Sequence, residues 1–212
     1  MNEYRLQYVQ GHANFPSPRL FKSHLGLSLF PAGFVRQAGG KIIYLSRNPK
    51  DCCTSFYHFL KHFVSGTFAT EWKILVEEDF IKGNVTHGPW LKHVTSWRRY
   101  GQDTSNVLSI TYEDLRTDYV QTLTKVAEFI ERPVSADDLQ RTTEKCSFGN
   151  MERDLKLPVY LDEKSFGATG NFFRKGAIGN WKTHFTVSQS EIFDREIDSK
   201  LKEHGLIYRY ET

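Results

Sequence analysis

One stretch of the chain has the residue types and spacing of an anion-binding site. The run KIIYLS at residues 41–46 is followed by RNPKD at 47–51 and then by a helical pattern that contains Ser55. A helix that begins after a strand presents unpaired backbone N–H groups and a positive dipole, and an arginine beside it adds a forked donor that suits phosphate. Because an arginine at a strand end also forms surface ion pairs, spacing alone leaves both interpretations open.

A second candidate is His24, which could act as a general base. An imidazole with an ordinary pKa near ~6.5 can accept a proton from a phenol or an alcohol at neutral pH. His24 follows a β-rich run at residues 19–23, and ligands of open α/β sheets bind at such strand ends. We expect the other isolated histidines to be ordinary surface or core residues; these are His12, His87, His93, His184 and His204.

A metal site is not expected. His58 and His62 lie four residues apart on one predicted helix and could face the same ion. No adjacent glutamate supplies the general base of an HExxH site, so this pair does not predict zinc.

The elements that must position these residues alternate between strands and helices. β-Branched and aromatic residues predict strands at 19–23, 41–46 and 107–112, the last two buried in a parallel sheet. Helical patterns cover residues 49–64, 71–81, 90–100, 115–131, 136–145 and 189–204, with capping boxes predicted at Ser188–Glu191 and Ser135–Asp138. Residues 159–170 read as a long loop. This order predicts an α/β fold.

Composition narrows the class of protein. The 212 residues suit a single domain over residues 1–212, and 39% hydrophobic residues suffice for a packed core. The net charge is only +3, with basic residues scattered among acids, which predicts no nucleic-acid groove. No run of ~20 apolar residues predicts a membrane helix, and no signal peptide is recognised. Three cysteines without zinc-type spacing suit a reducing compartment, so we expect a soluble, cytoplasmic protein.

Longer strings show a resemblance to a known family. YLSRNPKDCCTSFYHF resembles the 3'-phosphate-binding stretch of the cytosolic sulfotransferases, which transfer a sulfuryl group from 3'-phosphoadenosine 5'-phosphosulfate (PAPS) to hydroxyls or amines. The resemblance implies that Arg47 and Ser55 hold the 3'-phosphate. PSPRLFKSHLGLSLFP resembles the family's segment with the catalytic base, which implies that His24 is the base and Lys22 its cationic neighbour.

The resemblance continues in order toward the C-terminus and implies further nucleotide contacts. ITYEDLRTD places Tyr112 near the adenosine, and CSFGNM resembles the segment that wraps the adenine, with Phe148 as the stacking ring. FFRKGAIGNWK resembles the signature that closes over the 3'-phosphate. The implied nucleotide-binding residues are Arg47, Ser55, Tyr112, Cys146, Ser147, Phe148, Met151, Phe173, Arg174, Lys175 and Gly176.

The same resemblance implies an oligomeric state and a set of ligands. Lys182, Thr186, Val187 and Glu191 reproduce the family's K-x-x-x-T-V-x-x-x-E dimerisation pattern, so a homodimer is implied. PAPS is the implied co-substrate, without a metal, and a small molecule is the implied acceptor. The implied fold is a P-loop-kinase-like parallel sheet flanked by helices.

One family motif does not occur in this sequence. Family members carry an early strand and a glycine-containing loop of the type YPKSGTTW, which cradles the 5'-phosphosulfate, and no such string is present. We therefore expect an N-terminally incomplete sulfotransferase domain that lacks the family's first strand and loop. It would be a fragment, a truncated gene model or a degenerate paralogue, with weak or no turnover by itself.

Two alternatives follow from this departure. The chain could bind adenosine 3',5'-bisphosphate or dimerise without turnover, since the implied 3'-phosphate residues are intact. A nucleoside or nucleotide kinase shares the broad architecture, but no G-x-x-x-x-G-K-[ST] string occurs. A PAPS-dependent sulfotransferase remains the leading hypothesis.

Overall fold

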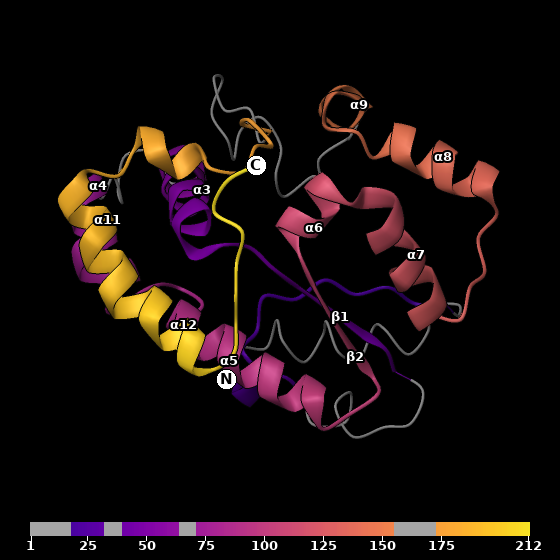
Figure 1. Ribbon diagram of the computed structural model, residues 1–212, viewed down its shortest axis with the longest axis horizontal. Helices are drawn as coiled ribbons and strands as arrows, with labels where there is room; N and C mark the ends of the chain where they lie inside the picture. Colours follow the sequence, from indigo (N-terminus) through magenta and orange to yellow (C-terminus); the bar gives the residue numbers. More distant parts are fainter. Residues whose placement is uncertain (1–17, 32–39, 64–70, 155–172) are drawn as a thin grey trace.

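Two parallel strands lie at the centre of the molecule, which we describe from a computed structural model of residues 18–31, 40–63, 71–154 and 173–212 (Figure 1). β1 (Ile42–Ser46) pairs in parallel with β2 (Val107–Thr111), and Ile43 lies opposite Leu108. The α/β class and the parallel pairing are confirmed. Burial is less complete than predicted, because Ile43 and Leu45 are 40% and 52% exposed. One face of β1 is therefore open to solvent among the described residues.

The predicted strand at residues 19–23 is wrong. These residues are exposed and have no regular secondary structure, and the 3-10 turn Leu27–Leu29 follows His24. A strand needs a partner for its backbone hydrogen bonds, and the described sheet pairs only β1 with β2. His24 therefore does not lie at the end of a strand.

Most helices lie at the predicted places and are more interrupted than the patterns suggested, whereas the helix at Phe148–Asp154 was not predicted. They are α3 (Pro49–Phe63), α4 (Trp72–Ile74), which continues as a π-helix over Leu75–Phe80, α5 (Trp90–Gln102), α6 (Tyr112–Thr117), α7 (Tyr119–Phe129), α8 (Ala136–Lys145), α9 (Phe148–Asp154), and α11 (Val187–Phe193), which continues as a π-helix over Asp194–Asp198 into α12 (Ser199–Glu203). Figure 1 shows α6 to α9 on one side of the strands and α3, α4, α11 and α12 on the other.

Capping explains where three helices begin, namely α6, α8 and α11. The single helix predicted over 115–131 is wrong, because Thr111 caps an earlier start and the chain breaks at Asp118, whose φ is −130°. The Ser135–Asp138 capping box is confirmed. The Ser188–Glu191 box is wrong, since the Thr186 hydroxyl accepts from the Gln189 amide at 3.2 Å and fills that role two residues earlier.

The main hydrophobic core lies on the α3 side of the sheet. It joins side chains from α3, the first π-helix, α5, the C-terminal helices and the segment that follows them: Cys53, Leu75, Val76, Phe80, Val94, Phe193, Ile197, Leu201 and Tyr208. The three cysteines are free thiols. The predicted loop at 159–170 lies outside the described residues. Within the described ranges, no helix combines the length and apolar character needed to cross a bilayer.

Candidate functional site

A cavity of about 140 Å³ gathers most of the predicted nucleotide-binding residues. Its lining comes from four separate parts of the chain and consists of Arg47, Ser55, Tyr112, Phe148, Phe173, Arg174, Lys175 and Gly176. All eight were predicted from the sequence. Three of them carry a positive charge and none is acidic. A cavity of this composition suits an anionic ligand that also has an aromatic part.

Arg47 is held at the carboxyl end of β1 with part of its hydrogen-bonding capacity unused. Its Nη2 donates to the Ala177 carbonyl at 2.8 Å, and its guanidinium lies 4.3 Å from the centre of the Tyr112 ring. The side chain is 19% exposed, yet its buried Nε has no acceptor within the described part of the chain. Buried donors are normally satisfied, so Nε is a candidate donor to a bound anion.

Arg174 faces the same cavity and is affected by the charge of Arg47. Burial, and next the positive charge of Arg47, lower the pKa of Arg174 from its ordinary value. Its Nη1 donates to the Asn180 side-chain oxygen. Two like charges brought together in a partly buried site repel each other, and an anion between them would relieve this cost.

Phe148 and Gly176 show why the cavity needs glycine at its edge. Gly176 has φ +61°, and a Cβ built on it would lie 2.2 Å from the Phe148 ring. Phe173 meets Phe148 edge to face, with ring centres 5.8 Å apart. The glycine therefore permits both the left-handed backbone and the close approach of the aromatic ring.

Three predicted nucleotide residues do not line this cavity. Cys146 is the exposed C-cap of α8. Burial raises the pKa of Tyr119 above its ordinary value, and the neighbouring Cys146 thiol adds to this rise. Ser147 precedes α9, and its hydroxyl accepts from the Asn150 amide at 3.4 Å. Met151 lies in α9, half-buried. These residues support α9, which carries Phe148, and do not reach the cavity in the state described.

The anion site expected at the N-terminus of α3 differs from the prediction in one respect. The Asn48 side chain accepts from the Asp51 amide at 2.8 Å, so this first-turn donor is already used. The cavity is instead lined by the Arg47 side chain and by Ser55, which lies farther along α3. Side chains, and not this helix-end amide, are the donors available there.

Asp51 is a supporting residue that sequence reasoning missed. Its fully buried carboxylate accepts from the Gly179 amide at 2.7 Å, from the Trp181 amide at 2.9 Å and from Asn48 Nδ2 at 2.9 Å. These bonds tie α3 to the turn that follows Gly176. The available signal was its place in the first turn of α3, four residues after Arg47, to which it forms an ion pair at 3.9 Å.

Glu113 joins the ends of the two strands. Its Oε1 accepts from the Asn48 amide at 3.0 Å and from Asn48 Nδ2 at 2.9 Å, while Oε2 is buried without a partner in the described ranges. Burial raises the pKa of Glu113 above its ordinary value, although the Asn48 donors oppose this. Asn48 and Glu113 thus hold Arg47 and Tyr112 at adjacent strand ends.

His24 lies apart from the cavity, in a cluster of histidines. Its ring stacks on His87 with centres 5.1 Å apart, and His93 Nε2 lies 3.4 Å from its carbonyl oxygen. Burial, followed by the charges of Lys22, His87 and His93, lowers the pKa of His24. The ring is therefore neutral at pH 7 and can accept a proton. His87 and His93 were expected to be ordinary residues, and their place beside His24 could not be read from the sequence.

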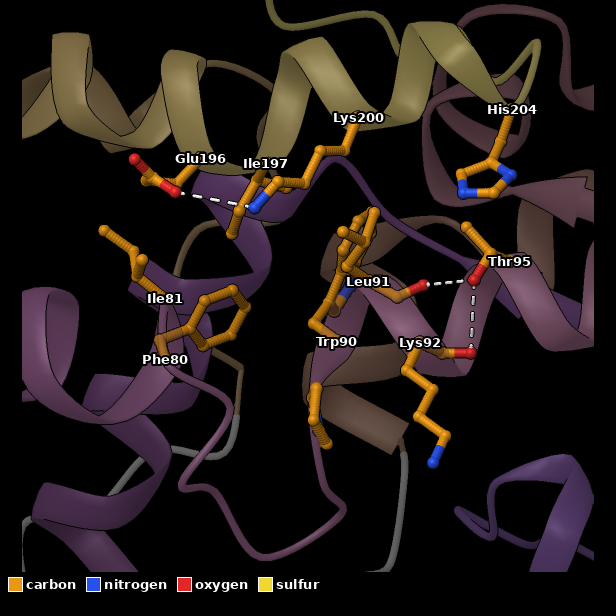
Figure 2. Close-up of a pocket in the computed structure, with 11 residues that line it drawn as sticks. Phe80, Ile81, Trp90, Leu91, Lys92, Thr95, Glu196, Ile197, Lys200 and His204 are labelled. Atoms are coloured by element: carbon orange, nitrogen blue, oxygen red, sulfur yellow. Dashed lines mark hydrogen bonds and ion pairs between the residues drawn. The ribbon is translucent and has the colours of Figure 1, made fainter.

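A larger cavity of about 280 Å³ contains none of the predicted site residues. Figure 2 shows Phe80 and Trp90 on opposite sides of it, with the Glu196–Lys200 ion pair at its rim. Its polar groups are partly engaged, because Thr95 donates to the Leu91 carbonyl at 2.8 Å. Size alone therefore does not identify the functional cavity.

The possible metal pair at His58 and His62 takes a different form. His58 Nε2 lies 2.8 Å from His184 Nε2, across to the turn before α11. This distance fits one shared hydrogen between two imidazoles. Among the described residues, no group of three histidine, cysteine or carboxylate side chains could hold a metal ion.

Comparison with known proteins identifies the family. Residues 3–205 match the family model described as the sulfotransferase domain. This chain belongs to the sulfotransferase family. It is 37% identical to human sulfotransferase 1E1 over 197 residues, 34% identical to rabbit amine sulfotransferase over 209 residues, and 36% identical to human sulfotransferase 2B1 over 196 residues.

The chain spans only part of these relatives. The matches cover 92%, 96% and 88% of this chain, but 66%, 68% and 51% of the three relatives. Solved structures show the same pattern. A mouse sulfotransferase complexed with PAP superposes with a TM-score of 0.80 at 29% identity, over 93% of this chain and 70% of that one. Retinol dehydratase in complex with retinol and PAP gives 0.82 at 25% identity, over 98% and 63%.

Proposed function

We propose that this chain binds PAPS and takes part in the transfer of its sulfuryl group to the hydroxyl or amine of a small acceptor. The convergence of Arg47, Arg174 and Lys175 on one cavity with aromatic walls carries the proposal. The unpartnered Nε of Arg47 and the repulsion between Arg47 and Arg174 both suit a bound phosphate. PAP in the structures of two related proteins adds support.

In this proposal the 3'-phosphate lies against Arg47, Ser55 and the Arg174–Gly176 segment. Phe148 offers its ring to the adenine, a contact worth roughly 1 to 3 kcal/mol for a stacked base. The Tyr112 ring lies against the Arg47 guanidinium and helps to hold it in place. Cys146, Ser147 and Met151 belong to the segment that carries Phe148, and their contacts with the nucleotide remain part of the proposal.

His24 is proposed as the general base. Its neutral imidazole takes the acceptor's proton while the acceptor oxygen or nitrogen attacks sulfur and the bond from sulfur to the 5'-phosphate oxygen breaks. Adenosine 3',5'-bisphosphate leaves, and the acceptor carries the sulfuryl group. Such in-line transfers depend on positioning and on charge stabilisation, and Lys22 supplies a positive charge near His24.

A homodimer through Lys182, Thr186, Val187 and Glu191 is proposed on the resemblance to the family pattern. Val187 supports it, since this apolar side chain is 77% exposed at the start of α11. Sedimentation should show a dimer that Val187→Glu converts to a monomer. We also propose that the protein acts in the cytoplasm, as in the cytosolic sulfotransferases that it resembles.

Turnover and binding together test the proposal. A sulfated product from labelled PAPS with at least one phenol, alcohol or amine, even at a low rate, would support transfer by this chain, and His24→Ala should give no product. Arg47→Ala should lower the affinity for adenosine 3',5'-bisphosphate at least about 10-fold, because a charge-assisted contact is lost. The exposed Arg99→Ala on α5 is the matched control.

A second candidate function is nucleotide binding without turnover. The residues gathered at the small cavity could hold adenosine 3',5'-bisphosphate whether or not sulfuryl transfer follows, which is the observation behind this candidate. Binding of adenosine 3',5'-bisphosphate that depends on Arg47, without product from any acceptor, would select this candidate. Absence of both binding and product would refute both candidates.

A further inference from the structure

The peptide that carries His24 is held by side chains of α5. Residues 19–25 form no strand, so the carbonyl groups of His24 and Leu25 have no ladder partner. His93 Nε2 lies 3.4 Å from the His24 carbonyl, and Trp97 Nε1 donates to the Leu25 carbonyl at 3.3 Å. His93 and Trp97 are four residues apart and therefore lie on one face of the helix. Two consecutive carbonyls are thus met by two consecutive turns of α5.

The hydrogen bonds of His93 determine which of its nitrogens carries the proton. A carbonyl oxygen can only accept, so Nε2 of His93 must carry the hydrogen toward His24. Nδ1 then has a free lone pair and accepts from the Tyr44 hydroxyl, 2.9 Å away. Burial raises the pKa of Tyr44 far above its ordinary value, so this hydroxyl keeps its proton. Both nitrogens of His93 are engaged, which leaves it unsuited to act as a base itself.

Tyr44 supports both donors from behind. Its ring stacks on His93 with centres 5.7 Å apart and on Trp97 with centres 5.6 Å apart, at interplanar angles of 24° and 21°. Phe30 meets Trp97 edge to face at 5.1 Å, which fixes the far end of the same segment. Three rings from β1 and α5 therefore form one packed unit against residues 24–30.

We propose that Tyr44, His93 and Trp97 form an aromatic clamp that positions His24 through its main chain. The catalytic consequence rests on the proposed function, because it takes His24 as the base, whereas the clamp itself does not. Tyr44 and Arg47 lie three residues apart where β1 ends. β1 thus supports the His24 segment through Tyr44, and Arg47, which follows the end of β1, lies at the nucleotide cavity. The two halves of the site are therefore positioned by one strand.

Two substitutions of His93 separate positioning from general stability. His93→Gln keeps an amide donor for the His24 carbonyl and an oxygen acceptor for Tyr44, whereas His93→Leu keeps the bulk and removes both. Lys92→Gln, on an exposed residue of the same helix, is the matched control. Long-range 1H–15N spectra of the imidazole rings should show His93 in the Nε2–H tautomer in the wild type.

The expected pattern distinguishes the clamp from the reaction. His93→Leu should speed amide exchange across residues 24–30 by at least about 10-fold and lower kcat about 10- to 100-fold, as misplacement of a reacting group does. The affinity for adenosine 3',5'-bisphosphate should stay unchanged, and His93→Gln should restore exchange and kcat toward wild type.

Each outcome decides one of the two claims. An Nδ1–H tautomer of His93, unchanged exchange in His93→Leu, or a Gln variant as impaired as the Leu variant would overturn the clamp. If the wild type gives no product with any acceptor, the proposed turnover fails, and the tautomer and exchange results alone decide the clamp.

Discussion

Removing the Asp51 carboxylate should uncouple α3 from the turn after the Arg174–Gly176 segment. Oδ2 accepts from the Gly179 amide and from Asn48 Nδ2, and Oδ1 accepts from the Trp181 amide, at 2.7 to 2.9 Å. Asp51→Ala removes the fully buried acceptor of the Gly179 and Trp181 amides, whereas Asn48 Nδ2 still donates to Glu113 Oε1 at 2.9 Å. An unsatisfied buried donor costs about 1 to 3 kcal/mol, so the loss for two donors is about 2 to 5 kcal/mol after partial relaxation.

Asp51→Asn gives a graded test of the same reasoning. The amide oxygen can replace Oδ2 and keep two of the three bonds, but its NH₂ group then faces the Trp181 N–H. One bond is lost and two donors oppose each other, so we expect about 2 to 3 kcal/mol. The exposed Asp103→Asn at the end of α5 is the control and should stay within about 0.5 kcal/mol of wild type.

Urea unfolding followed by tryptophan fluorescence measures these changes, and Trp181 lies at the affected turn. Both Asp51 variants should also bind adenosine 3',5'-bisphosphate more weakly in calorimetry, because Arg174 to Gly176 lose their anchor. An Asp51→Ala variant that stays within about 1 kcal/mol of wild type, or that is no less stable than Asp51→Asn, would show that Asp51 does not anchor this turn.

Three further substitutions test neighbouring parts of the site. Gly176→Ala places a Cβ 2.2 Å from the Phe148 ring at a backbone φ of +61°. The affinity for adenosine 3',5'-bisphosphate in calorimetry should therefore fall at least about 10-fold, and an unchanged affinity would contradict the close approach. Burial raises the pKa of Glu113, so the folded state holds its proton more tightly than the unfolded chain does; wild type should lose stability relative to Glu113→Gln as pH rises from below 4.5 through the raised pKa, and a difference in urea stability that is flat with pH would count against this. Lys50→Met keeps the packing of a side chain that is 4% exposed but removes bonds to Asp194 at 2.6 Å and Ser190 at 2.7 Å, so the free energy of unfolding should fall by about 1 to 3 kcal/mol; no shift in the urea midpoint would show that these bonds contribute nothing.

Local patterns predicted what depends on neighbours in the chain. β1, β2 and α8 follow from β-branched runs and from a capping box, and their predicted positions are confirmed. Ordered strings, read as a family resemblance, predicted all eight residues of the small cavity, although they come from distant segments. The grouping of these residues was therefore accessible from the sequence, and their contact with a nucleotide is the proposal.

Features that depend on tertiary contact could not be predicted. Residues 19–23 have strand-forming side chains, but no described strand pairs with them. Ser188 and Glu191 have the spacing of a capping box, yet Thr186 and Gln189 form it, and Gln189 also accepts from Trp72 Nε1 at 3.1 Å. The place of His93 beside His24 depends on the packing of α5, which spacing does not reveal.

Calorimetric titration with adenosine 3',5'-bisphosphate, with adenosine 5'-monophosphate as comparator, tests the central claim most directly. The cavity of Arg47, Arg174 and Lys175 is proposed to recognise the 3'-phosphate, so the bisphosphate should bind at least about 10-fold more tightly than the monophosphate. Equal affinity for the two nucleotides, or no heat of binding with either, would contradict the account.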